Sequence, residues 1–228
     1  MKVIITGSTG LVGSAVVREC IANNKITHAF VLSRKQLGDD LAHHPKITVV
    51  IHDDFSSYPE TLLEQLKGSQ ACIWAIGGLA THFPDVETYR NVQVNYTISG
   101  AKSMINYLVP QLAPRVKFRF VFCSGKLAEW DQEQSLYFLA DTRKGKGEVE
   151  KQLCGLADDD KNQFEVWCAR PSAILPSEAG LLSRLSGRLY DAILVHDLAR
   201  ALVNVALEGH SERIIESCEL AKIGAAGS

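Results

Sequence analysis

Residues 1–20 read MKVIITGSTGLVGSAVVREC, and this stretch decides the fold. A short apolar run at residues 3–5 leads into three glycines spaced three apart, at Gly7, Gly10 and Gly13. The residues that follow place apolar side chains near helical spacing, which predicts a helix. A glycine turn between a buried strand and a helix lets backbone amides approach a phosphate group closely, because glycine has no side chain in the way.

The rest of the chain alternates short apolar runs with helical patterns. Further apolar runs lie at residues 28–34, 46–51, 70–77, 116–125 and 164–171. Helical patterns lie at residues 57–66, 86–108, 146–156 and 196–209. This alternation is typical of a parallel sheet covered by helices on both faces. We therefore predict an α/β fold with a doubly wound parallel sheet in a single domain over residues 1–228. The only stretch that could form a segment covering the substrate is 176–190.

The composition argues against several classes of protein. The 228 residues carry a formal net charge of −2 with acids and bases well mixed, so no basic stripe indicates nucleic-acid binding. No apolar run reaches the roughly 18 residues of a membrane span, and the first residues lack a secretory pattern. Six scattered cysteines without a CxxC pair favour a reduced, cytoplasmic protein. The histidines show no metal-ligand spacing, so we expect no metal site.

In this context the glycine spacing predicts dinucleotide binding, with a purely structural turn as the alternative. The first glycine permits the turn, the second admits the pyrophosphate, and the third lets the helix pack on the strand. The helix N-terminus adds free N–H groups and a positive dipole. No Gly-Lys-Ser/Thr ends the turn, which excludes a P-loop. The predicted contacts are Gly7, Ser8, Thr9, Gly10, Leu11, Val12 and Gly13.

The end of the second strand indicates which dinucleotide binds. A cofactor without a 2′-phosphate is usually held by an Asp or Glu about 20 residues past the glycines. Here the strand ends in Ser33, Arg34 and Lys35, which offer a hydroxyl and two cations without a carboxylate. A guanidinium can bind a phosphate with two hydrogen bonds. We predict NADP(H); the alternative is that the two cations are ordinary surface charges.

Several motifs in order carry a family resemblance. They are TGSTGLVG at 6–13, HDDF at 52–55, CSG at 123–125, KGEVE at 146–150 and ARPSAILP at 169–176. Together they resemble the atypical short-chain dehydrogenase/reductases, and most closely the small NAD(P)-binding members that are NmrA-like or similar to the Tat-interacting protein. The resemblance covers nearly the whole chain. It is informative for fold and cofactor and weak for substrate, because one fold hosts many functions.

The resemblance implies particular site residues. Ser124 and Lys146 stand at the catalytic positions, where Lys146 also holds the nicotinamide ribose, and Asn95 stands where a helix residue supports the site through water. A simple turn role is the alternative for Asp54 and Ser124, and a helix-surface role is the alternative for Asn95. The further cofactor contacts implied are Asp54 and Phe55 beside the adenine, Ala75, Ile76 and Gly77 beside the ribose, and Pro171, Ala173 and Ile174 over the carboxamide.

One departure from the family pattern concerns the catalytic acid. These enzymes normally use Tyr-x-x-x-Lys, in which the ammonium lowers the pKa of a phenol one helical turn away. Four residues before Lys146 stands Thr142, and in the other possible register Ala140 precedes Lys144. Neither register supplies a tyrosine, and Tyr137 lies nine residues before Lys146. We favour Lys146, since it completes a KGxxExxL pattern.

Two hypotheses follow for the function. The first is an NADP(H)-dependent oxidoreductase or related isomerase acting on a small organic molecule. Its proton would come from His82, from Tyr137 or from water relayed through Lys146. The second is a non-enzymatic NADP(H)-binding regulator. An open apolar pocket beside the nicotinamide would favour the enzyme, whereas a filled one would favour the regulator. The oligomeric state is not predicted.

The cofactor prediction can be tested by titration. If Arg34 binds the 2′-phosphate, NADPH should bind at least ~10-fold more tightly than NADH, which corresponds to about 1.4 kcal/mol. Arg34→Asp should reverse this order, because a carboxylate repels the phosphate and accepts from a free ribose hydroxyl. Equal affinities of the unmodified chain for the two cofactors would contradict the prediction.

Overall fold

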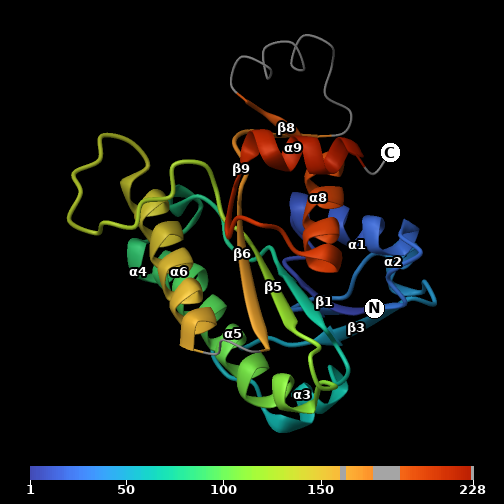
Figure 1. Ribbon diagram of the computed structural model, residues 1–228. Coiled ribbons are helices and arrows are strands. Elements are labelled where there is room, and N and C mark those ends of the chain that lie inside the picture. Colours follow the sequence, from blue (N-terminus) through green and yellow to red (C-terminus); the bar gives the residue numbers. More distant parts are fainter. Residues whose placement is uncertain (160–162, 177–190, 227–228) are drawn as a thin grey trace.

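The computed structural model describes residues 1–159, 163–176 and 191–226, and the predicted substrate-covering segment falls almost wholly outside them. The described residues form a parallel sheet of seven strands in the order β3-β2-β1-β4-β5-β6-β9 (Figure 1). Its strands are β1 (Lys2–Thr6), β2 (His28–Ser33), β3 (Ile47–Ile51), β4 (Ala71–Trp74), β5 (Phe118–Cys123), β6 (Phe164–Arg170) and β9 (Ile214–Glu216). The short strands β7 (Ile174–Leu175) and β8 (Ile193–Leu194) pair separately. From β1 the chain adds β2 and β3 toward one edge of the sheet, and then returns to add β4, β5, β6 and β9 toward the other edge, so its direction of winding reverses between β1 and β4.

Helices cover both faces of this sheet. Figure 1 shows one layer beside β1 and β2 that contains α1 (Leu11–Ala22), α2 (Asp39–Ala42), α8 (Val195–Glu208) and α9 (Ser217–Ala226). The opposite layer contains α3 (Glu60–Gln65), α4 (Val86–Arg90), α5 (Tyr96–Tyr107) and α6 (Ala140–Asp159). Short helical turns lie at Ala80–His82 and Val109–Gln111. The predicted doubly wound parallel sheet is therefore confirmed.

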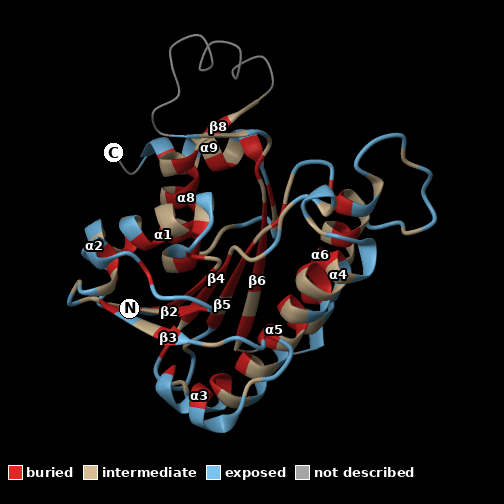
Figure 2. Cartoon of the chain, turned by 180° about the vertical axis from the view of Figure 1, so that it is seen from behind, coloured by how far each residue is buried: buried red, intermediate tan, exposed pale blue. Residues whose placement is uncertain are grey.

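The apolar runs became strands because both of their faces are buried. In β1, Val3 and Ile5 pack into the core under α1 and α8, while Ile4 packs into the core under α5 and α6. All three side chains are fully buried. Figure 2 shows the same pattern across the sheet, with buried residues along the central strands and on the helix faces turned toward them. Continuous apolar runs without polar alternation follow from this two-sided burial.

The pattern at 86–108 was predicted as one helix, and the structure divides it. Asp85 caps α4 by accepting a hydrogen bond from the Thr88 amide at 2.6 Å. A π-helical turn then spans Asn91–Asn95 before α5 begins. A π turn inserts one residue into the helical repeat, so apolar spacing alone does not reveal it. The turn changes which side chains face the sheet.

The sequence reasoning also missed the last strand and helix, β9 and α9. The strand has three residues, which is too short for a recognisable apolar pattern. It pairs in parallel with β6, from Cys168 opposite Ile214 to Arg170 opposite Glu216. Among the described residues, no helix is both long and apolar enough to cross a membrane.

Candidate active site

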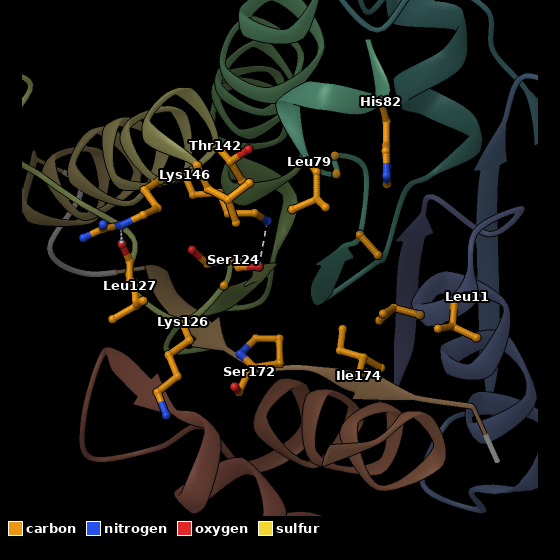
Figure 3. Close-up of a pocket in the computed structure, with 18 of the residues that line it drawn as sticks. Leu11, Leu79, His82, Ser124, Lys126, Leu127, Thr142, Lys146, Ser172 and Ile174 are labelled. Atoms are coloured by element: carbon orange, nitrogen blue, oxygen red, sulfur yellow. Dashed lines mark hydrogen bonds between the residues drawn. The ribbon is translucent and has the colours of Figure 1, made fainter. Parts of the chain in front are cut away.

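A cleft of about 560 Å³ lies at the carboxyl edge of the sheet, where β1 and β4 lead into loops (Figure 3). In open α/β sheets this change of winding direction is where ligands bind. Figure 3 shows Leu11 on the side of the glycine turn and Ser124, Thr142 and Lys146 on the side of α6. The predicted site residues that line the cleft are Gly10, Leu11, Val12, Gly13, Ala75, Gly77, Ser124, Lys146, Pro171 and Ile174.

The three glycines of the turn meet different physical demands. Gly7 has a φ of 70°, and a Cβ there would lie 2.4 Å from the Ala75 oxygen. A Cβ at Gly13 would lie 2.1 Å from the Gly7 oxygen, so α1 packs directly on the turn. Gly10 has an ordinary φ of −90°, and its Cβ would meet only the Gly7 oxygen at 3.4 Å. Gly7 and Gly13 are therefore required by packing, whereas Gly10 borders open space in the cleft.

The start of α1 is suited to an anion. Its first turn carries no acidic residue, and no side chain caps it. Its first N–H groups therefore remain available at the positive end of the helix dipole. Ser8 is buried and Thr9 is exposed, and neither side chain is among the residues lining the cleft.

The predicted adenosine contacts follow β2 and β3 at the same edge. The Ser33 hydroxyl is buried and accepts a hydrogen bond from the Lys35 amide at 3.2 Å. Arg34 and Lys35 are exposed, and within the described residues their side chains make no ion pair. The Asp54 carboxylate accepts hydrogen bonds from the Ser56 hydroxyl and amide, which lower its pKa. Phe55 is buried, so its backbone is the part available beside a base.

The exit of β4 contains a residue that the sequence reasoning missed. Gln93, in the π-helical turn, is fully buried and its Oε1 accepts from the Gly78 amide at 3.4 Å. Gly77 has a φ of 139°, and a Cβ there would lie 2.4 Å from this oxygen. Asn95 is exposed and donates to Asn91 at 3.1 Å, away from the cleft. The π turn thus directs Gln93, and not Asn95, to the back of the site.

The two predicted catalytic residues meet at the end of β5. The Lys146 ammonium donates to the Ser124 carbonyl oxygen at 2.7 Å. Burial in the cleft wall lowers the pKa of Lys146, while the Cys123 thiol and the Glu150 carboxylate act in the opposite direction. Lys144 instead donates to the Gln132 carbonyl at 2.5 Å. Lys146 is therefore the lysine that lines the cleft.

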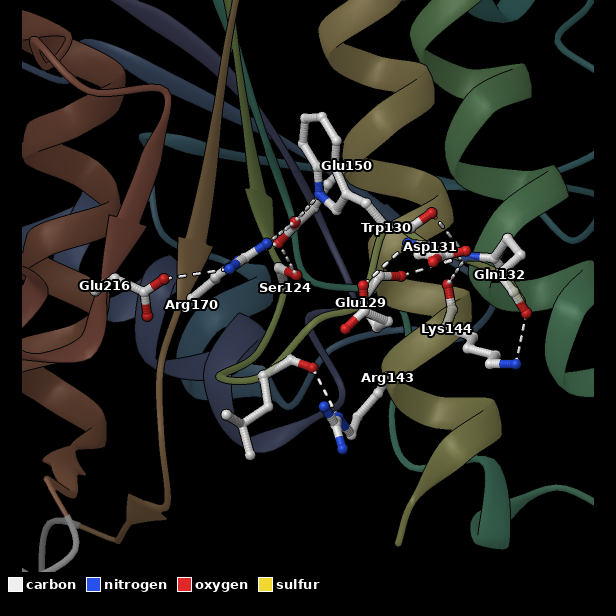
Figure 4. A network of polar contacts seen from close by, with 11 residues as sticks. Ser124, Glu129, Trp130, Asp131, Gln132, Arg143, Lys144, Glu150, Arg170 and Glu216 are labelled. Carbon is white, nitrogen blue, oxygen red and sulfur yellow. Dashed lines mark hydrogen bonds and ion pairs between the residues drawn. The ribbon is translucent and has the colours of Figure 1, made fainter. Parts of the chain in front are cut away.

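A buried carboxylate organises the side chains behind Ser124 (Figure 4). Glu150 is fully buried and accepts hydrogen bonds from the Ser124 hydroxyl at 2.6 Å and from the Trp130 indole at 2.7 Å. Arg170 binds both of its oxygens, at 2.9 and 2.5 Å, and also pairs with Glu216 at 3.2 Å. The single hydroxyl proton of Ser124 is therefore committed to Glu150.

Thr142, four residues before Lys146, lines the cleft. Its hydroxyl oxygen accepts from the Ala80 amide at 2.8 Å, and its carbonyl accepts from the buried Tyr89 hydroxyl at 3.1 Å. His82 also lines the cleft. Tyr137 is fully exposed on the loop before α6 and is not among the lining residues. Of the three proton sources considered above, His82 and Lys146 reach the cleft in this structure.

Comparison of the sequence with known proteins gives partial matches. No family model matches the chain. The chain is 30% identical over 124 residues to leucinostatins biosynthesis cluster protein T of Purpureocillium lilacinum. The aligned region covers 54% of this chain and 42% of that protein. The chain is also 28% identical over 104 residues to the mitochondrial protein FMP52 of Debaryomyces hansenii, with 45% of this chain and 44% of that protein aligned. The matches thus span less than half the length of either relative.

Comparison of structures defines the fold. Gre2 from Candida albicans in complex with NADPH superposes with a TM-score of 0.72 at 17% identity, covering 95% of this chain and 77% of Gre2. UDP-glucuronic acid 4-epimerase from Bacillus cereus, in complex with UDP-glucuronic acid and NAD, superposes with a TM-score of 0.66 at 14% identity. This superposition covers 95% of this chain and 77% of the epimerase. The chain therefore has the Rossmann-type fold of these enzymes, in agreement with the fold that the resemblance to short-chain dehydrogenase/reductases implied.

The different roles of the turn glycines can be separated by mutation. Gly10→Val should abolish NADPH binding in a titration while the circular dichroism spectrum stays unchanged, because the new side chain enters the cleft. Gly13→Val should instead lose the fold, because its Cβ overlaps the Gly7 carbonyl. Unchanged cofactor affinity in Gly10→Val would mean that the turn is only structural.

The buried carboxylate should contribute strongly to stability. Glu150→Ala leaves the Arg170 guanidinium, whose side chain is 17% exposed, without its main partner. We expect the free energy of unfolding, measured by urea titration, to fall by about 3 kcal/mol or more. Asp158→Ala is the control, because Asp158 on the same helix pairs with Arg213 at 2.7 Å with both side chains largely exposed. Its loss should stay below about 1 kcal/mol, and equal losses would contradict the assignment.

Proposed function

We propose that this protein binds NADP(H) and acts as an oxidoreductase or related isomerase on a small organic molecule. The observation that carries the proposal is the open cleft that brings the glycine turn together with Ser124 and Lys146. Reduction of a carbonyl adds a hydride from the reduced cofactor to carbon and a proton to oxygen, leaving an alcohol and the oxidised cofactor. The chain must therefore bind the cofactor, orient the carbonyl and supply a proton.

The residues present fit a dinucleotide phosphate. The uncapped start of α1 and the open space at Gly10 suit the pyrophosphate. Parallel pairing places Thr6 opposite Leu32, so Arg34 follows β2 beside the turn and can reach a 2′-phosphate. Lys146 is the candidate for the nicotinamide ribose hydroxyls. The known protein Gre2 was crystallised with NADPH, and the epimerase with NAD, which supports this class of cofactor.

The origin of the proton distinguishes this site from a tyrosine-dependent one. Ser124 donates to Glu150, and an aliphatic hydroxyl such as that of Thr142 is a far weaker acid than a phenol. Lys146 has a lowered pKa and donates one hydrogen bond to protein, which leaves two N–H groups. We infer that Lys146, directly or through water, or His82 protonates the substrate oxygen. Because the site lacks a phenol as the acid, we expect ordinary ketones to be turned over slowly even where they bind.

A non-enzymatic NADP(H)-binding regulator is the second candidate. The threonine at position 142 favours it, because it removes the family's acid. The open cleft beside Lys146 favours the enzyme, since a regulator has no need for such a space. A cytoplasmic location is part of the proposal and rests on six unpaired cysteines, of which four are buried.

The missing acid can be restored by mutation. Wild-type protein should oxidise NADPH weakly or not at all with a panel of simple ketones and aldehydes, followed by absorbance. Thr142→Tyr places a phenol one helical turn before Lys146 and should raise turnover. Thr142→Phe is the matched control, because it adds the same ring without the hydroxyl.

Two outcomes would contradict this view of the chemistry. Equal activity of the tyrosine and phenylalanine variants, with both folded and binding NADPH, would show that the acid is not what the site lacks. Brisk wild-type turnover of simple ketones would also contradict it, because the site would then not lack an acid. If that turnover survives His82→Ala combined with Tyr137→Phe, neither side chain is needed and Lys146 is the remaining source of the proton.

A further inference from the structure

Exposed apolar side chains gather around one part of the cleft. Leu79, Leu127, Phe138 and Leu139 each expose between 37% and 55% of their surface, and all four line it. They come from two segments, the loop after β4 and the loop between β5 and α6. Single exposed apolar residues are ordinary, but such a group in a concave site is typical of a binding surface. We call these four residues the apolar rim.

Two members of the apolar rim have strained backbone. Leu127 has a φ of 67° and Leu139 a φ of 49°, in the left-handed region that bulky residues rarely adopt. Glycine would occupy both positions without strain, so a leucine at each needs another reason. Strain of this kind tends to persist where surrounding contacts enforce it and where the side chain serves a function.

The Arg143 side chain holds one of the strained residues in place. Its Nε donates to the Leu127 carbonyl at 2.9 Å. Its guanidinium also lies 5.2 Å from the centre of the Phe138 ring, within the range of a cation–π contact. Arg143 therefore supports the apolar rim at Leu127 and Phe138.

Two lysines also line the cleft. Lys126 pairs with Asp191 at 3.2 Å. Lys146 donates to the Ser124 carbonyl, keeps two N–H groups and lies on the side of the cleft assigned to the cofactor. Among the described residues that line the cleft there is no carboxylate, so a cationic group on a ligand would find no charged partner.

We propose that the apolar rim binds the uncharged alkyl or aryl substituent of a small carbonyl compound. This rests on the proposed function, which places the carbonyl group beside Lys146. The glycine turn and Lys146 take the cofactor's share of the same cleft, so the substrate is small. The rim then covers the substituent and leaves the carbonyl carbon toward the nicotinamide.

The proposal is tested with ligands of graded length. Full-length protein, with and without saturating NADPH, is titrated with 2-butanone, 2-hexanone and 2-octanone by isothermal calorimetry. Affinity for the alkanones should rise about 3- to 4-fold for each added methylene until the rim is filled.

Glycine variants separate the function of the rim from its structure. Leu127→Gly and Leu139→Gly relieve the strained φ, so the thermal midpoint should hold or rise, while 2-octanone affinity falls about 10-fold. Arg115→Gly is the control, because Arg115 has a φ of 69° but precedes β5 at the opposite edge of the sheet. It should leave 2-octanone affinity unchanged.

The outcomes distinguish this inference from the proposed function. Failure of NADPH to bind overturns the proposed function, whereas the alkanone series without NADPH still tests the rim. Affinity independent of chain length, or full alkanone affinity in both leucine variants, would each overturn the apolar assignment. A rim that instead mediates self-association would show as chain-length-independent binding together with concentration-dependent sedimentation.

Discussion

The contact between the turn after β1 and the helix that follows it is the constraint on which the site depends. With no side chain at Gly13, α1 lies directly on the Gly7 carbonyl, and with none at Gly7 the turn lies directly against β4. These two approaches fix where the helix begins relative to the sheet edge. Because the start of α1 is the positive end of its dipole, the same packing that closes the core also creates an anion site.

A second constraint acts on the other wall of the cleft. The buried Glu150 ties α6 to β6 through Arg170, to β5 through Ser124 and to the following loop through Trp130. A carboxylate in this position is tolerated because every hydrogen-bonding partner around it is a donor. The arrangement uses the hydroxyl proton of Ser124. A residue that resembles a catalytic serine therefore has no hydroxyl proton left to donate to a ligand.

These two walls differ in chemical character, and the difference bears on substrate choice. The glycine-turn side offers backbone N–H groups, which suit phosphate oxygens. The side formed by the loop between β5 and α6 offers leucine and phenylalanine, and the Arg143 side chain contacts both Leu127 and Phe138. One cleft thus combines a polar half for a nucleotide with an apolar half for a small organic group.

The amino-acid sequence by itself determined six strands of the sheet, their two-sided burial and the place of the turn, because these depend on local signals. Glycine spacing, continuous apolar runs and helical periodicity are each visible within a few residues. For the lysine on α6 the sequence allowed Lys144 or Lys146 and favoured Lys146. The two lie about 200° apart around a helix, and the structure places Lys146 on the cleft.

Only the tertiary structure decided the remaining features. The π turn brings Gln93 to the site in place of Asn95. The apolar rim joins residues from the loop after β4 with others from the loop before α6, and the commitment of Ser124 to Glu150 spans 26 positions along the chain. Such contacts link segments that are distant in sequence. They form only when the sheet and helices pack together, so no pattern within a few residues predicts them.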